Sequence, residues 1–156
     1  MYDWQMSIDK TVGSSGNGHN KVRFYRQLKR FYGVEHYCKE TIPRLHRAAF
    51  AFRCGAAPLK IETGRYRNLL LTKWYVHFVL TYTEDKTHAN LHCPAYEDLK
   101  RDLFDKVKYN YCNTFTQLGD KDACKICVLF STEYLVRNVA NTCFYILRTR
   151  ISLLYK

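Results

Sequence analysis

Apolar residues recur every three or four positions along two long stretches, and this period constrains the fold more than any other feature. Downstream of a cap at Ser131 or Thr132, the apolar stripe comprises Val136, Val139, Ala140, Cys143, Leu147, Ile151 and Leu154. After Pro94, an acidic first turn leads into a second stripe, made of Tyr96, Leu99, Leu103 and Val107. A period close to 3.6 residues places apolar side chains on one face of a helix. The sequence therefore predicts a mainly α fold.

Three further segments are predicted to be helical. Residues 21–33, "KVRFYRQLKRFYG", carry apolar side chains on one face, and residues 43–55, "PRLHRAAFAFRCG", begin with a proline and end with a glycine. Proline suits the first turn of a helix and glycine suits the position after its end. A shorter helix is predicted to run from a cap at Asp120 through Phe130.

The helix predicted at residues 21–33 allows two interpretations of its aromatic residues. One face holds Phe24, Tyr25, Leu28, Phe31 and Tyr32. The opposite face holds Arg23, Arg26 and Arg30. In the first interpretation the rings stack on nucleic-acid bases between basic residues. In the second, they face the core while the arginines meet solvent or phosphate. The clean separation of the two residue classes around the axis favours the second.

One segment favours β structure. Residues 74–82, "WYVHFVLTY", are rich in β-forming residues and alternate apolar side chains, which predicts a short strand or hairpin within 72–83. Residues 1–20 end in "VGSSGNGHN" and are predicted to be a flexible lead-in. The rest, residues 21–156, has the length of a single helical domain.

The chain carries a formal net charge of +11, and the excess is uneven. Residues 21–67 contain twelve Lys and Arg residues against three Glu, whereas residues 84–106 contain more acids than bases. Such an excess favours RNA or single-stranded DNA as the partner, because Lys and Arg neutralise phosphates. A basic face that is merely solvated is the alternative. The predicted nucleic-acid-binding residues are Lys21, Arg23, Arg26, Lys29, Arg30, Arg44, Arg47 and Arg65.

The cysteines and the hydropathy bear on location. The chain has seven cysteines without a compact framework, and "MYDWQMSIDK" lacks an apolar signal core. We therefore expect a nuclear or cytoplasmic protein that is not secreted, with reduced thiols, most of them buried as small hydrophobic residues. No apolar run reaches the length of about 18 residues that spans a bilayer, so no membrane partner is expected.

His88 and Cys93 have the residue types and close spacing of zinc ligands. Two ligands provide only half of a tetrahedral structural site. The apparent free energy of zinc binding reaches on the order of 10–16 kcal/mol only when all four ligands are present. His77 and His92 would complete a substitute set only if the backbone rearranged. We therefore expect no cofactor, and we interpret the pair as an unoccupied half-site beside the start of a helix.

Other chemical motifs are weak or absent. Cys124 and Cys127 form a C-x-x-C, but it lies in a predicted helix without a second pair, so buried helix cysteines are favoured over a redox or metal site. The sequence contains no Gly-rich phosphate loop, no G-x-S-x-G and no H-E-x-x-H. We expect no catalytic residue and no enzyme activity.

Four segments resemble, in order, the C-terminal part of reverse transcriptases from animal non-LTR retrotransposons. They are "NKVRFYRQLKRFYGVEHYC", "PRLHRAAFAFRCGAAPLKIETGRY", "EDKTHANLHCPAYEDLKRDLF" and "LVRNVANTCFYILRTRISLLYK". The likeness covers roughly residues 17–156. In that family the polymerase, with its paired catalytic aspartates, lies upstream, and nothing here is similar to it. The resemblance implies a detached tail of such an enzyme.

The resemblance also explains the half-site. The family has C-x-x-C, nine residues, then H-x4-C, a zinc knuckle associated with template nucleic acid. His88 and Cys93 match the second pair, but Tyr75 and Phe78 stand where the two cysteines belong. The resemblance therefore implies a degenerate zinc knuckle in a retrotransposon-derived chain.

These observations lead to one hypothesis and its rivals. We expect a non-catalytic nucleic-acid-associated domain that uses its basic region without a metal. The first alternative is a protein interaction or scaffold module with no nucleic-acid role, whose basic face is solvated or docked on an acidic protein. The second is a non-functional retroelement relic.

Overall fold

The computed structural model is mainly α, as the sequence predicts. It describes residues 28, 33–39, 41–59, 75–76, 79–83 and 85–154. The helices are α3 (Pro43–Arg53), α5 (Glu97–Gln117), α6 (Asp122–Ser131) and α7 (Val136–Leu154). Short 3-10 turns span His36–Lys39, Pro94–Tyr96 and Glu133–Leu135, and a π-helical turn spans His88–His92. No helix in these ranges has the length and apolarity needed to cross a membrane.

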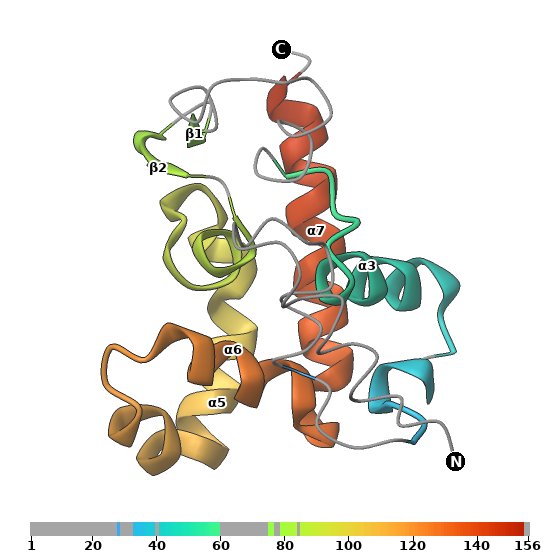
Figure 1. Cartoon of the computed structure of the whole chain (residues 1–156), viewed down its shortest axis with the longest axis vertical. Coiled ribbons are helices and arrows are strands. Elements are labelled where there is room, and N and C mark those ends of the chain that lie inside the picture. The colour runs from blue at the N-terminus through green and yellow to red at the C-terminus, as the bar shows by residue number, and fades with distance from the viewer. Residues whose placement is uncertain are drawn as a thin grey trace, which may run out of the picture.

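The strands form an antiparallel hairpin inside the predicted segment 72–83. Strand β1 (Tyr75–Val76) pairs with β2 (Val79–Thr83), with Val76 opposite Val79. Figure 1 shows the hairpin at the edge of the helical body, away from the centre. The main packing therefore falls to the helices.

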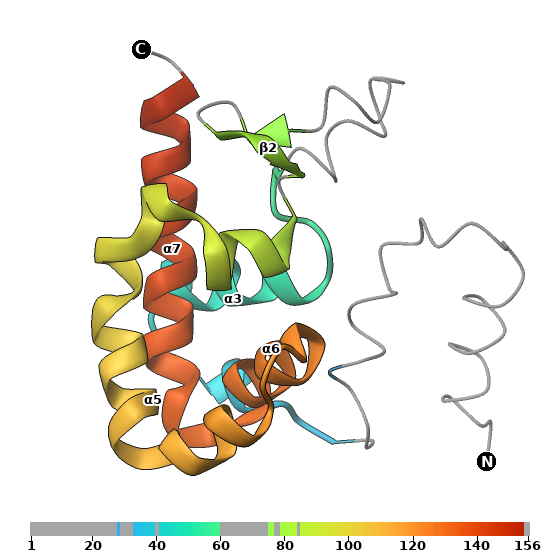
Figure 2. The ribbon, with the colours of Figure 1, turned by 90° about the vertical axis from the view of Figure 1, so that its left-hand side faces the viewer.

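The long helix α7 is the centre of the fold. It contacts α3 on one side and α5 and α6 on the other (Figures 1 and 2). Its buried face includes Val139, Cys143 and Ile146, which are at most 3% exposed. Burying such side chains stabilises the fold by roughly 1.5–3 kcal/mol each, so α7 is its main organiser.

Helix α3 has the ends that its sequence predicts. Pro43 occupies the first turn, where backbone N–H groups have no partner within the helix, so the N–H that proline lacks is not needed there. At the other end the Cys54 N–H donates to the Phe50 carbonyl at 2.9 Å, and Gly55 follows with φ +68°. This left-handed conformation suits glycine and turns the chain off the helix.

Helix α5 buries the predicted stripe. Tyr96, Leu103 and Val107 are at most 2% exposed, and Leu99 is half-buried. Of the stripe predicted for residues 21–33, the structure describes Leu28, which is buried in the same core. The other predicted members of that helix lie outside the described residues, as do residues 1–20.

Several details of α6 and α7 differ from the prediction. Lys121, not Asp120, precedes α6, and no side chain caps that helix. Thr132 does not cap α7 directly, because a 3-10 turn intervenes and the Thr132 hydroxyl donates back to the Val128 carbonyl at 2.7 Å. Near the end of α7 the predicted core residue Ile151 is 52% exposed. Among the helices that the structure describes, α3, α5 and α6 pack against lower turns of α7 than these (Figure 2).

The prediction that most cysteines are buried is wrong. All seven lie in the described ranges and are free thiols, but only Cys93 and Cys143 are buried. Cys38, Cys112 and Cys124 are exposed, which places three thiols in solvent. Burial raises the pKa of the Cys143 thiol far above its usual range, so this thiol stays neutral.

Arg53, one of the basic residues of the 21–67 region, does not contribute to a basic surface. Its side chain is 3% exposed, forms an ion pair with Glu35 and donates to the Phe130 carbonyl at 2.8 Å. Its guanidinium also lies 5.1 Å from the centre of the Tyr37 ring. These contacts tie the end of α3 to α6 and to the segment before the first 3-10 turn.

Replacing Arg53 by methionine should lower the free energy of unfolding by about 3–5 kcal/mol, because Glu35 and the Phe130 carbonyl would lose their partner in the interior. Urea unfolding followed by circular dichroism measures the change. The control is Arg47→Met, which removes an exposed arginine from the same helix and should change stability little. Equal effects of the two variants would contradict the structural role of the Arg53–Glu35 pair.

Candidate nucleic-acid interface

The structure describes two of the predicted nucleic-acid-binding residues. Arg44 and Arg47 are exposed on α3. The other six lie outside the described residues: Lys21, Arg23, Arg26, Lys29, Arg30 and Arg65. Both described residues of the predicted basic region therefore lie on α3.

Helix α3 packs against α7, and neither helix contains an Asp or a Glu. The exposed stripe of α7 consists of Arg137, Asn141, Tyr145 and Arg148, spaced by four, four and three residues. Together the two helices expose four arginines: Arg44, Arg47, Arg137 and Arg148. We call the exposed residues of these two helices, which include no Asp or Glu, the α3–α7 face. The sequence analysis missed its α7 half, although the helical spacing of these polar residues was a usable signal.

Arg44 joins the two helices of this face. Its guanidinium lies 5.5 Å from the centre of the Phe144 ring, a cation–π contact from α3 to α7. Phe144 in turn meets Tyr145 edge to face, with ring centres 5.3 Å apart. In the described part of the chain, neither Arg47 nor Arg148 has an acidic partner, so both keep their charge available for a ligand.

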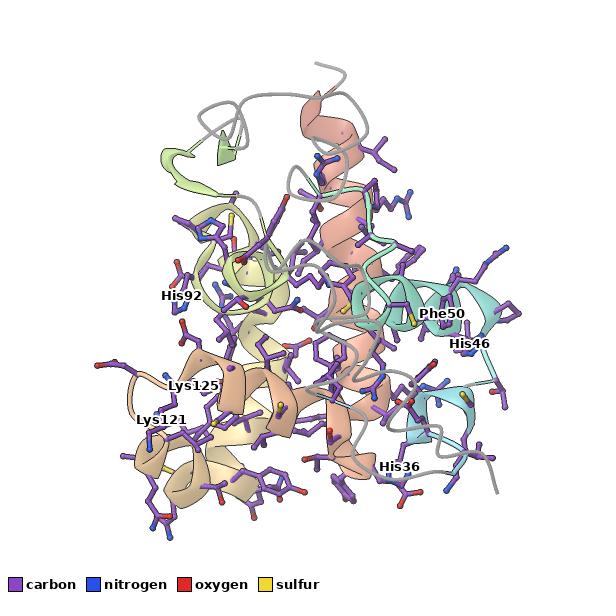
Figure 3. All side chains as sticks on the ribbon, in the orientation of Figure 1. His36, His46, Phe50, His92, Lys121 and Lys125 are labelled. Atoms are coloured by element: carbon purple, nitrogen blue, oxygen red, sulfur yellow. The ribbon has the colours of Figure 1, made fainter. Side chains whose placement is uncertain are left out.

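The acidic residues of the described part of the chain lie outside α3 and α7, most of them on or next to α5 and α6, although Glu133, in the turn directly before α7, pairs with Lys39 and His36. Those on α5 are Glu97, Asp98, Asp102 and Asp105. Asp98 pairs with Arg101, and the carboxylate of Asp122 at the start of α6 accepts from His92 Nε2 at 2.6 Å. Figure 3 shows His92 near Lys121 and Lys125, across the molecule from His46 and Phe50 of α3. Within the described residues, α5 and α6 therefore mix acids with bases, whereas the charged residues of α3 and α7 are all basic.

The predicted half-site is a folded and mostly buried turn. His88 is 5% exposed and Cys93 is fully buried, and the Cys93 N–H donates to the His88 carbonyl at 2.8 Å. Asp85 accepts from the His88 N–H at 2.7 Å, as a capping residue does. Asn90 donates to the Lys86 carbonyl at 2.8 Å and accepts from Cys143 of α7 at 3.8 Å. Hydrogen bonds thus hold the start of the turn to Asp85 and its middle to Cys143 in the core.

A buried lysine fastens the other end of this turn. Lys100 of α5 is 4% exposed, and its ammonium donates to the carbonyls of Leu91 and Cys93, each at 3.1 Å. These carbonyls lie at the end of the turn, where helical carbonyls lack partners. Burial lowers the pKa of Lys100, although Cys93 and Glu97 oppose the shift.

An open cavity of about 630 Å³ lies between this turn and α5. Its lining includes Lys100 and Arg101, but also the carboxylates of Glu97 and Asp105. The opposite charges nearly balance, and His92 on its rim is already bound to Asp122. This cavity therefore lacks the charge excess that a polyanion requires, in contrast to the α3–α7 face.

The residues do not fit a structural zinc site. Within the described ranges, no three His, Cys, Asp or Glu residues converge as a metal site would require. His92 faces Asp122 of α6, and His77 lies outside the described residues. The positions of the family's two cysteines hold Tyr75 and Phe78, which supply no thiolate.

The C-x-x-C lies on α6, as predicted, but the prediction that its cysteines are buried is half wrong. Cys127 is half-buried and packs against the core, whereas Cys124 is exposed. No disulfide joins them. The C-x-x-C therefore has one structural cysteine and one surface thiol.

Comparison with protein-family models, curated proteins and solved structures found no match to this chain. The resemblance to retrotransposon reverse transcriptases therefore stays a prediction, which rests on the four quoted segments.

Zinc added to metal-free protein should leave its unfolding transition unchanged, because His88 and Cys93 provide only two donors. Elemental analysis and thermal unfolding with and without a chelator measure the effect. The variant Cys93→Ala serves as the control, since it should be equally insensitive to zinc. One tightly held equivalent that disappears in this variant would contradict the assignment of the turn as metal-free.

The free energy of unfolding should rise with pH between the lowered pKa of Lys100 and the ordinary lysine value of 10.5. Over this window the unfolded chain keeps a proton that the folded chain has lost, so raising the pH favours the folded state. Urea unfolding at several alkaline pH values measures the slope. Lys100→Met should lose this contribution and the exposed Lys108→Met should keep it. Identical slopes in both variants would argue against a perturbed Lys100.

Proposed function

We propose that the chain is a non-catalytic nucleic-acid-binding domain that holds its ligand through the α3–α7 face and without a metal. One observation carries this proposal. Two helices in direct contact contain no Asp or Glu and expose four arginines, while most described acids lie on or next to α5 and α6, and Glu133, the acid directly before α7, is already paired with Lys39. A surface of one sign attracts a polyanion over distances of about a Debye length, roughly 8–10 Å.

Arginine suits phosphate for geometric reasons as well. Its planar guanidinium makes paired hydrogen bonds to phosphate oxygens, and a neighbouring carboxylate would compete for the same donors. Arg47 and Arg148 have no such competitor in the described part of the chain. Each phosphate that they neutralise releases condensed counterions, so the affinity is expected to depend strongly on salt.

This proposal agrees with the expectation from the resemblance but moves the surface. The sequence placed the basic region at residues 21–67, and Arg44 and Arg47 belong to it. Arg53 of that region is internal, and Arg148 lies far along the chain, on α7. In this proposal the packing of α3 on α7 adds arginines of α7 to the two described arginines of the predicted region, Arg44 and Arg47.

Reversing the charge of Arg47 and Arg148 together, as Arg47→Glu and Arg148→Glu, should weaken binding of single-stranded RNA about tenfold or more at low salt. It should also reduce the slope of log affinity against log salt by about two, one for each lost phosphate contact. Fluorescence anisotropy of a labelled oligonucleotide at several salt concentrations measures both quantities.

The matched control reverses charge on the acidic side. Lys108→Glu with Lys121→Glu introduces the same change of net charge at exposed residues outside the face and should affect binding much less. Equal losses in the two double variants would mean that net charge alone governs binding. Undetectable binding of the parent protein would favour the alternative of a protein interaction module or a non-functional relic.

A further inference from the structure

Two large aromatic rings stand in solvent on the α3–α7 face. Phe50 of α3 is 45% exposed and Tyr145 of α7 is 40% exposed, whereas Phe52 and Ile146 on the same helices are fully buried. An exposed ring leaves apolar surface in water, at a cost that burial would remove. Their position beside the arginines therefore calls for a physical explanation.

Each exposed ring is supported by another ring. Phe50 contacts Tyr37, with ring centres 6.3 Å apart, and Tyr37 stacks on His46 at 5.7 Å. Tyr145 meets Phe144 at an interplanar angle of 69°. Tyr37 is buried and Phe144 is half-buried, so both supports are anchored in the core. A ring held in this way loses little conformational entropy when a ligand packs on it.

Each exposed ring also has an arginine one helical turn away. Arg47 precedes Phe50 by three residues, and Arg148 follows Tyr145 by three residues. Residues three apart on a helix are surface neighbours, with Cβ atoms about 5–6 Å apart. Both helices thus present a cation and a ring side by side, which are the partners of a phosphate and a base.

We infer that the ligand of the α3–α7 face is a single strand, with Phe50 and Tyr145 as its base-stacking residues. This inference rests on the proposed function and adds to it the class of nucleic acid. In a duplex the faces of the bases are covered by their neighbours, so these rings gain nothing from it. In a single strand the faces are accessible, and stacking on an aromatic side chain adds affinity without sequence preference.

Two other strongly exposed tyrosines of the described residues also have a cation three residues away, Lys106 for Tyr109 and Arg137 for Tyr134, but each has an acid within one helical turn. Tyr109 is 89% exposed but lies on α5, the helix that carries four acids, and Tyr134 is 76% exposed directly after Glu133. Neither residue belongs to a carboxylate-free helix. Tyr109 is therefore a matched control, a highly exposed ring outside the proposed binding face.

The test compares Phe50→Ala, Tyr145→Ala and Tyr109→Ala in the full chain. Anisotropy titrations use a single-stranded RNA and a duplex of the same sequence, and oligonucleotides with 2-aminopurine report stacking by fluorescence quenching. We expect each of the first two variants to bind the single strand about tenfold more weakly, with reduced quenching and an unchanged salt slope. Duplex affinity should not change, and Tyr109→Ala should bind like the parent.

Conservative variants separate stacking from folding. Phe50→Tyr and Tyr145→Phe keep a ring and should retain the parent affinity, and urea unfolding verifies that all variants are folded. If the alanine variants keep full single-strand affinity while the charge reversals of Arg47 and Arg148 lower it, stacking is wrong and the proposed function stands. If neither set changes binding, both proposals fail.

Discussion

Burial of one face of α7 is the constraint on which the rest of the structure depends. Cys143 and Ile146 are fully buried at its centre, and α3, α5 and α6 all pack against this helix. Because an amphipathic helix of this length gains most of its stability from tertiary contacts, the neighbouring helices and α7 stabilise one another. The same packing brings Arg44 of α3 onto the Phe144 ring of α7, so the core determines which side chains of the two helices meet at the surface.

The two sides of the molecule differ because the helices differ in composition. On the α5 and α6 side, cations and carboxylates pair locally, as Arg101 does with Asp98 and His92 does with Asp122. On the side of α3 and α7 no carboxylate is present in either helix. Exposed ion pairs such as these contribute at most about 1 kcal/mol each to the free energy of unfolding. They also neutralise charge that a ligand would otherwise meet.

The sequence predicts the helical architecture well, because apolar spacing and helix-end residues are local signals. Pro43, Gly55 and the stripe from Tyr96 to Val107 behave as their positions predict. It does not predict the interior charges, since the burial of Arg53 and Lys100 depends on partners that tertiary packing supplies. For the same reason Ile151 departs from the prediction: it has the right helical period but is 52% exposed. The spacing of Arg137, Asn141, Tyr145 and Arg148 indicates one exposed face of α7, but only tertiary packing places α3 next to this helix.

The turn from His88 to Cys93 closes at both ends on groups of the chain itself, Asp85 at the start and the Lys100 ammonium at the finish. An ammonium that holds two carbonyls does locally what a bound cation does in other small folds, but it is covalently part of the protein and cannot be chelated or diluted away. The conformation of this turn is therefore tied to the protonation of a single side chain, because a neutral amine would bind the two carbonyls less strongly than an ammonium does.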